Sequence, residues 1–130
     1  MKKKNCCCEF ASERSETLLR NFRESLARQS QISAMKAFSD AVEAPAPRFW
    51  VSEVRAMRII SFLMKGNEEI LESMHRKKKE MYLEIFRRVK SIRESDPEIS
   101  LGDAVFQVVN STAPESYITP GWCAKILRSL

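Results

Sequence analysis

The chain has 130 residues, of which 44% are hydrophobic and 30% charged, and its formal net charge is +5. That length and composition are typical of one soluble domain with an apolar core. Only three residues are glycine, and the leucine, isoleucine, valine and alanine content favours helices over a sheet-rich fold. No stretch approaches the roughly 18 apolar residues of a membrane span, and no apolar segment follows the basic residues Lys2–Lys4. We therefore expect an all-α cytoplasmic protein with no membrane contact.

Residues that carry catalytic or metal chemistry are sparse. Cys6, Cys7 and Cys8 are adjacent within residues 1–9, which we expect to form a flexible basic tail, and Cys123 falls in an apolar helical pattern. With His75 as the only histidine, this spacing fits neither a disulfide framework nor a zinc site. The chain also lacks a glycine-rich phosphate loop and a triad pattern. We expect no enzymatic activity, metal, cofactor or small-molecule substrate.

Three helices are predicted in the first half of the chain. The first spans about residues 12–29, where Leu18, Phe22 and Leu26 recur at helical spacing. The second ends before Pro45, and the third ends at Gly66. The side chains expected to cap the starts of these helices are Ser12 or Ser15, then Ser33, then Ser52.

The second half is predicted to repeat this order. After a short link near residues 67–74, a long helix spans about residues 75–95, and Pro97 lies just beyond its end. Ser100 is expected to cap the next helix. Thr119 followed by Pro120 is a strong start signal for the last one.

The two halves resemble each other in sequence. Residues 32–60 align with residues 99–127 at a constant offset of 67 without gaps, with seven identities in 29 positions. The similarity predicts one helical unit used twice. We expect a single domain over residues 10–130, built as a pseudo-twofold pair of three-helix units at about 12–65 and 75–130. The tripeptides 49–51 and 116–118 can pair as a minimal two-stranded bridge.

Charge is distributed unevenly along the second half. Residues 76–93 carry a net charge of +6, and residues 94–115 carry −5. One interpretation is a solvated basic helix that the acidic run balances. The other is an anion-binding stripe, because Lys and Arg concentrated along a helix are typical of nucleic-acid-binding proteins.

A helix, a connection and a crossing helix are the elements of a helix-turn-helix, which presents its later helix to the DNA major groove. The third helix of each unit carries exposed cations at Arg55 and Arg58, and at Lys125 and Arg128. Arginine and lysine are the residues that bind guanine edges and phosphates. The connection at residues 44–51 is longer than the turn of that motif.

The two tryptophans allow an alternative function. Trp50 can fill the gap between helices or stack on a base or partner, and both interpretations stay open. Trp122 aligns with Arg55 and lies near Lys125, so we expect it to be exposed and available for contact. These side chains would serve a protein-protein interaction module, such as a dimeric adaptor or an inhibitor of a host or phage protein.

The segments 46–52, 78–89 and 113–121 resemble those of small uncharacterised proteins carried by bacterial phages and mobile elements. The resemblance covers about residues 12–128 and implies a bacterial, cytosolic context in which small basic helical proteins act on DNA or on a host or phage protein. It implies no particular activity.

The leading hypothesis is a non-enzymatic nucleic-acid-binding protein of a phage or mobile element, with DNA as its partner. A protein partner or a homodimer is the alternative. The residues expected to contact nucleic acid are Arg55, Arg58, Arg76, Lys77, Lys78, Lys79, Arg87, Arg88, Lys90, Lys125 and Arg128, and those expected to contact a protein are Trp50 and Trp122.

Overall fold

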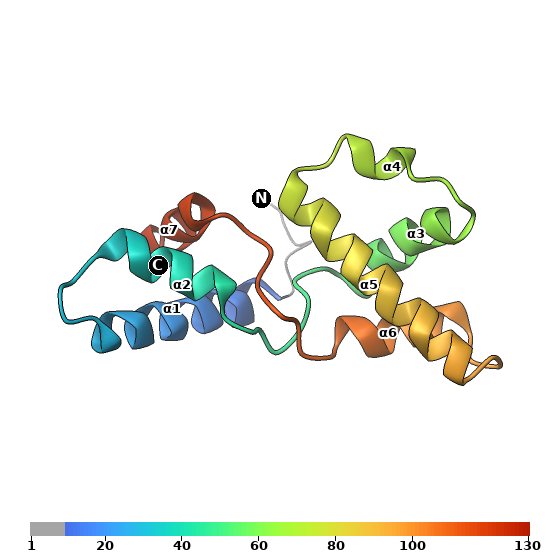
Figure 1. Cartoon of the computed structure of the whole chain (residues 1–130), viewed down its shortest axis with the longest axis horizontal. Helices are drawn as coiled ribbons and strands as arrows, with labels where there is room; N and C mark the ends of the chain where they lie inside the picture. Colours follow the sequence, from blue (N-terminus) through green and yellow to red (C-terminus); the bar gives the residue numbers. More distant parts are fainter. Residues whose placement is uncertain (1–9) are drawn as a thin grey trace, which may run out of the picture. The chain divides into compact units, whose positions relative to one another are not determined.

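A computed structural model describes residues 10–130, over which the chain forms helices and no sheet, so the all-α prediction is confirmed (Figure 1). The predicted basic tail lies outside the described residues. The helices are α1 (Ala11–Arg28), α2 (Ala34–Glu43), α3 (Glu53–Met64), α4 (Glu69–Glu72), α5 (Arg76–Ser95), α6 (Leu101–Val109) and α7 (Pro120–Arg128).

Four of the helices begin at the capping residues that the sequence predicts. The hydroxyl groups of Ser33, Ser52, Ser100 and Thr119 each accept a hydrogen bond from the backbone N–H three residues ahead. The prediction for α1 is wrong, because its first residue is Ala11 and Phe10 stands at the cap without a side-chain bond.

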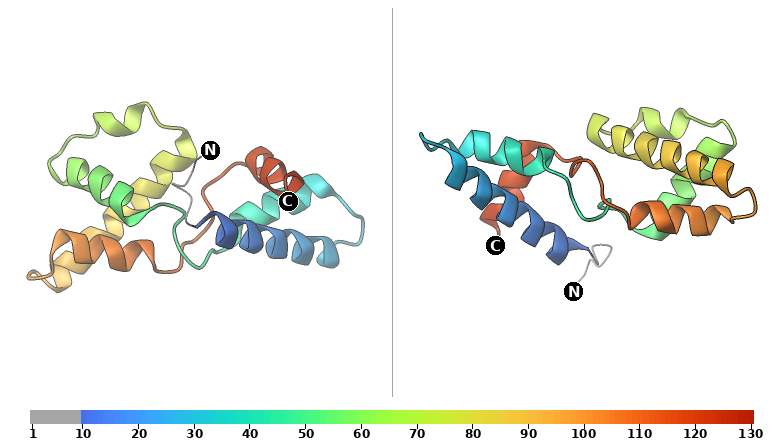
Figure 2. Two further views of the ribbon diagram at one scale, coloured as in Figure 1. Left: turned by 180° about the vertical axis from the view of Figure 1, so that it is seen from behind. Right: turned by 60° about the horizontal axis from the view of Figure 1, so that its bottom comes forward.

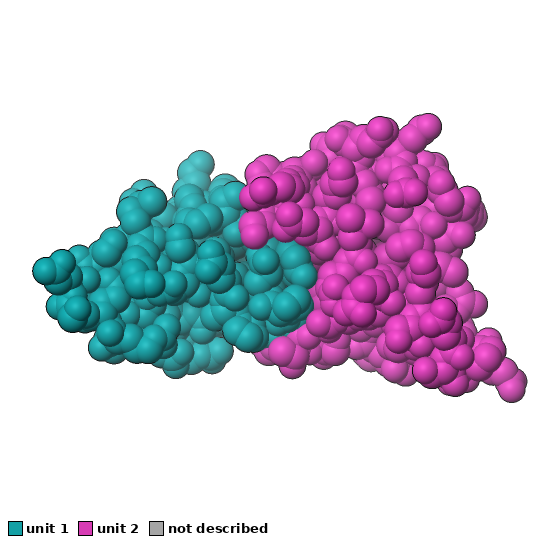
Figure 3. Space-filling view, viewed as in Figure 1, with its two compact units in different colours: residues 1–46, 113–130 teal, residues 47–112 magenta. Residues whose placement is uncertain are grey.

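The two compact units of the molecule draw their helices from both halves of the chain. Unit 1 comprises the chain up to Ala46 together with Ala113–Leu130, so it contains α1, α2 and α7 (Figure 3). Unit 2 comprises Pro47–Thr112 and contains α3 to α6. The compact units therefore do not coincide with the predicted repeats.

This division overturns the predicted helix-turn-helix. α2 packs against α1 and α7, whereas α3 packs against α5 and α6. The chain leaves α2 as extended backbone at Ala44, with φ −71° and ψ 149°, and proline at 45 and 47 keeps the preceding residues extended. α3 thus becomes part of a different unit from α2, and α7 a different unit from α6.

Unit 1 has a small apolar core where α7 covers the pair α1 and α2, as two further views show (Figure 2). Cys123 on α7 is fully buried in this core, and burial raises the pKa of its thiol from 9.0 to about 11. The buried members are Leu18, Phe38, Ala41, Val42, Cys123 and Ala124, with Phe22, Ile118, Ile126 and Leu127 packed against them.

Unit 2 has a larger core formed by α3, α5, α6 and the segment before α3. Phe49, Trp50 and Val51 are buried, at 0%, 7% and 4% exposure, so this apolar tripeptide is part of the interior. The buried residues on the helices are Ala56, Ile59, Ile60, Leu63, Leu71, Met81, Tyr82, Ile85, Val89, Ala104, Val105, Val108 and Val109.

A single antiparallel bridge joins Ala46 and Ala113, which align with each other at the offset of 67. Each residue donates its N–H to the carbonyl oxygen of the other, at 3.0 and 2.8 Å. The predicted pairing of the tripeptides 49–51 and 116–118 is wrong, because their first N–H groups bond to helix ends instead. Phe49 donates to Val109 at 3.0 Å, and Ser116 donates to Val42 at 2.9 Å.

Candidate nucleic-acid interface

The first turn of α5 carries four consecutive cations, Arg76 to Lys79, and no acidic residue. Glu80 lies 3.8 Å from Arg76 and 4.0 Å from Lys77. Lys78 and Lys79 are exposed and form no ion pair with any described residue. Because the helix dipole places partial positive charge at this end, each cation here is disfavoured by about 0.3–1 kcal/mol. The first turn of α5 is therefore an electrostatically unfavourable arrangement that an anion would relieve.

The Nδ1 atom of His75 caps this helix end by accepting a hydrogen bond from the N–H of Lys77 at 3.1 Å. The only histidine is accordingly used as a cap, and it shapes the helix end that presents Lys78 and Lys79.

Glu84, one turn further along α5, binds two of the predicted contact residues. Its carboxylate accepts hydrogen bonds from Arg87 Nη2 and from Arg88 Nε, both at 2.7 Å. The hydrogen bond from Arg87, assisted by that from Arg88, holds the pKa of Glu84 below its ordinary value against the opposing effect of burial. Arg87 stays exposed at the surface, whereas Arg88 does not.

Arg88 is a structural residue of unit 2. Its Nη1 donates hydrogen bonds to Ser111 Oγ at 3.2 Å and to the carbonyl oxygen of Thr112 at 2.8 Å. Its guanidinium also lies 5.1 Å from the centre of the Phe49 ring. Through hydrogen bonds from both Nε and Nη1, Arg88 holds the segment after α6 against α5.

A second row of residues runs along α5 beside its buried face. Lys79, Leu83, Phe86 and Lys90 follow one another at spacings of four, three and four residues, which places them on one side of the helix. Leu83 is 40% exposed, and the Lys90 ammonium lies 4.9 Å from the centre of the Phe86 ring. The row therefore has a cation at each end and two apolar side chains between them. Its helical spacing is a signal by which the sequence could have predicted it.

Arg55 on α3 lies next to Tyr82 on α5. Burial raises the pKa of Tyr82, and the nearby Arg55 guanidinium opposes this to a smaller extent. Since Tyr82 is one helical turn beyond Lys78 and Lys79, this contact places Arg55 of α3 about one turn from those two cations of α5. We use the name α3–α5 basic surface for the exposed cations of these two packed helices that are considered below, which are Arg55, Arg58, Lys78, Lys79 and Lys90.

The predicted contact residues of α7 belong to unit 1. Trp122 is 48% exposed, and the Lys125 ammonium lies 5.6 Å from the centre of its indole. Arg128 is exposed one turn further along. Trp122 is thus accessible as expected, whereas the buried Trp50 is not.

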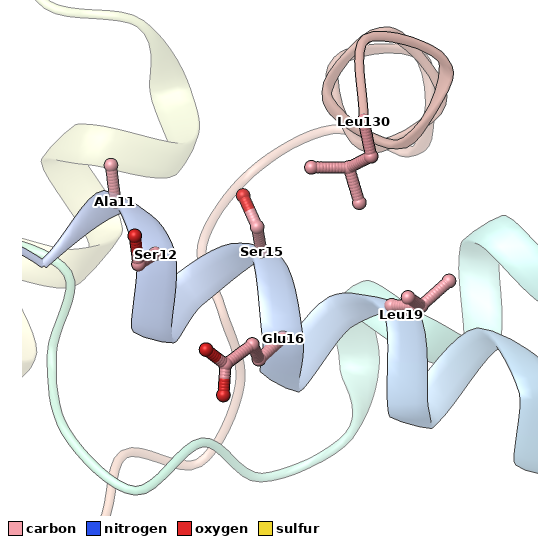
Figure 4. Close-up of a pocket in the computed structure, with 6 residues that line it drawn as sticks. All are labelled: Ala11, Ser12, Ser15, Glu16, Leu19 and Leu130. Atoms are coloured by element: carbon pink, nitrogen blue, oxygen red, sulfur yellow. The ribbon is translucent and has the colours of Figure 1, made fainter.

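Unit 1 has a shallow pocket between the start of α1 and the C-terminal Leu130. The pocket measures about 330 Å³ and is lined by Ala11, Ser12, Ser15, Glu16, Leu19 and Leu130, with Ser15 and Leu130 facing each other across it (Figure 4). At the offset of 67, Ser15 corresponds to Tyr82 and Leu130 to Leu63. Ser15 thus stands at the pocket, whereas Tyr82 is a buried side chain of unit 2.

Within the described part of the chain, no group of three or more His, Cys, Asp or Glu side chains is arranged to hold a metal ion. Among the described helices, none has the length and apolarity needed to cross a bilayer. Comparisons of the chain with protein-family models, with curated proteins and with solved structures find no match.

Proposed function

We propose that this chain is a non-enzymatic nucleic-acid-binding protein that contacts duplex DNA through the α3–α5 basic surface of unit 2. The observation that supports this most is the first turn of α5, where Lys78 and Lys79 are exposed and form no ion pair with described residues at a helix end that disfavours them. A phosphate placed there neutralises both the side chains and the helix end.

The neighbouring cations extend this contact in two directions. Lys90 lies along α5, and Arg55 with Arg58 lies on the adjacent α3. Arg76 can add to this contact, because an exposed ion pair such as its pair with Glu80 contributes at most about 1 kcal/mol. These side chains position the protein on the backbone and carry no sequence information by themselves.

Protein binding through α7 is the second candidate function, and the exposed Trp122 favours it. An indole that is half exposed beside Lys125 and Arg128 provides both apolar area and charge, as interface anchors do. Such a contact depends on apolar burial and is therefore much less sensitive to salt than phosphate binding.

We also propose that the two halves are a duplicated helical unit. The hydrogen bonds of the bridge region support this, because Phe49 to Val109 becomes Ser116 to Val42 when the offset of 67 is applied. The duplication does not extend to the basic surface. Lys78 and Lys79 correspond to Ala11 and Ser12, so only unit 2 is expected to bind DNA.

Fluorescence anisotropy of a labelled mixed-sequence duplex tests the DNA proposal. We expect binding at about 50 mM salt, with a logarithmic affinity that falls with the logarithm of salt concentration at a slope of about 0.9 per phosphate contacted. A slope of about 3 to 5 would match the cations of the α3–α5 basic surface. Absence of binding at low salt, to duplex and to single strand alike, would refute the proposal and leave protein binding as the stronger candidate.

A further inference from the structure

Unit 1 is assembled from two pieces of chain that are separated by the whole of unit 2. One piece ends at Ala46 and carries α1 and α2, and the other begins at Ala113 and carries α7. The chain passes between the units only at the peptide bonds after Ala46 and after Thr112. α7 is therefore connected to its own docking site only through unit 2.

The contact between the two pieces includes apolar packing and backbone hydrogen bonds. On α7, Cys123 and Ala124 are buried against side chains of α1 and α2, and Ile118, Ile126 and Leu127 pack around them. The Ala46–Ala113 bridge and the bond from Ser116 to Val42 add backbone hydrogen bonds to this contact. None of these contacts requires that both pieces come from the same molecule.

Proline stiffens both crossings between the units. Pro45 and Pro47 flank Ala46, and Pro114 follows Ala113. A residue before proline is restricted to extended backbone, which applies to Ala46 at the first crossing and to Ala113 at the second. A stiff, extended connection can carry α7 to a different molecule at little additional conformational cost.

We propose that α7 also docks on the α1–α2 pair of a second copy of this chain, which produces a helix-exchanged dimer. The exchanged unit 1 keeps every contact of the monomer, which is the condition under which such exchange is inexpensive. Docking of α7 on its own chain competes with docking on a second copy. For a short connection, the effective concentration of α7 at its own docking site is on the order of millimolar. The helix-exchanged dimer should therefore become detectable when the protein concentration approaches this effective concentration, or when docking of α7 within its own chain is disabled.

Complementation between two defective variants tests this proposal. Both variants carry Cys6→Ser, Cys7→Ser and Cys8→Ser, so that Cys123 is the only thiol. The first adds Ala41→Arg, which places a charge at a fully buried position of the acceptor site but leaves α7 intact. The second adds Cys123→Arg, which disables its own α7 but leaves the acceptor site intact and removes the remaining thiol.

Each variant alone has a broken unit 1, and the mixture can restore one intact unit for every two chains. At about 0.5 mM of each chain, we expect Cys123 of the first variant to react with a thiol reagent about tenfold more slowly in the mixture than alone. Light scattering should detect the mass of two chains in the mixture. Leu18→Arg, at the other helix of the acceptor site, should behave as Ala41→Arg does.

The matched control replaces the second variant by a chain that carries both Ala41→Arg and Cys123→Arg, which offers no acceptor and should give no protection. Protection in the first mixture alone supports helix exchange. The proposal is overturned if Cys123 reacts equally fast alone and in the mixture for both acceptor variants, with only single-chain mass detected, and the unaltered chain is also monomeric at about 1 mM.

Discussion

Units 1 and 2 both cover a pair of helices with a third helix, but they differ in how well that contact is filled. In unit 2, Tyr82 and Leu63 are 1% and 4% exposed. In unit 1 the corresponding residues are Ser15 and Leu130, and Leu130 is 67% exposed beside the shallow pocket. The side chains differ in volume at one of these two positions only, Tyr82 against Ser15, because the other position is leucine in both units.

Polar side chains connect the helices within each unit. Unit 1 joins α1 to α2 through Ser25 Oγ, which donates to Asp40 Oδ2 at 2.7 Å, and through Asn21 Nδ2, which donates to the carbonyl oxygen of Ala41 at 3.2 Å. Unit 2 joins α5 to the segment after α6 through Arg88, whose partners are Glu84, Ser111 and Thr112. We therefore expect unit 2 to be the more stable unit and the better platform for a binding surface.

The largest expected effect comes from emptying the filled position in unit 2. Tyr82→Ser removes a buried aromatic ring, so the free energy of unfolding should fall by about 3–5 kcal/mol, as for other large-to-small core changes. Chemical denaturation followed by circular dichroism measures this. Ser15→Ala is the matched change in unit 1 and should alter stability by less than about 0.5 kcal/mol. Similar effects of the two changes would contradict the comparison.

Arg88→Ala should have the next largest effect. It removes the hydrogen bonds to Glu84, Ser111 and Thr112 and the contact with Phe49, which together should cost about 2–3 kcal/mol of stability. Arg87 binds the same carboxylate but is 67% exposed, so Arg87→Ala should cost at most about 0.5 kcal/mol. Denaturation curves of the two variants measured side by side distinguish a structural arginine from a surface one.

The outcome for these two arginines illustrates what the sequence could and could not predict. Helical spacing and Ser or Thr caps located α2, α3, α6 and α7, because those signals are local. Arg87 and Arg88 looked equivalent in the sequence, because the partner that separates them, Thr112, lies in a distant segment. The sequence also could not predict that α7 packs on α1 and α2 while α3 packs on α5 and α6. An apolar stripe shows which face of a helix is buried, but it does not identify the helix that covers that face.

The basic surface was predicted in part for the same reason. The cations of α5 were evident from their density in the sequence. The contact of Arg55 with Tyr82 was not, because it joins α3 to a helix of the other half of the chain. The pocket beside Ser15 could not be predicted either, because it depends on the packing of the C-terminal Leu130 near α1.

Ser25→Ala should destabilise unit 1 less than Arg88→Ala destabilises unit 2, and its effect should depend on pH. The hydrogen bond from Ser25, with help from Lys36, lowers the pKa of Asp40 from its ordinary 3.8. This stabilisation is complete above pH 3.8 and is lost as the pH falls through the lowered pKa. Thermal melts at several pH values should therefore show the two proteins converging in acid. A constant difference would exclude Asp40 as the cause.

The smallest expected effect comes from filling the pocket of unit 1. Ser15→Tyr copies the residue that unit 2 has at this position, and it should raise stability by about 0.5–1 kcal/mol, as cavity-filling changes commonly do. Glu24→Tyr adds the same side chain at an exposed position of α1 outside the pocket and serves as the control. A loss of stability in Ser15→Tyr alone would show that the pocket does not match the volume occupied by Tyr82.

The central claim is that unit 2 alone carries the DNA-binding surface, and paired charge reversals test it most directly. One variant carries Lys78→Glu and Lys79→Glu, and the other carries Arg20→Glu and Arg23→Glu on α1, at exposed positions of unit 1. Both reduce the net charge equally, so any non-specific effect of charge is matched. Anisotropy titrations at low salt should show at least about a tenfold loss of DNA affinity, with a salt slope smaller by about 2, for the first variant only. Equal losses in both variants, or no loss in either, would contradict the claim.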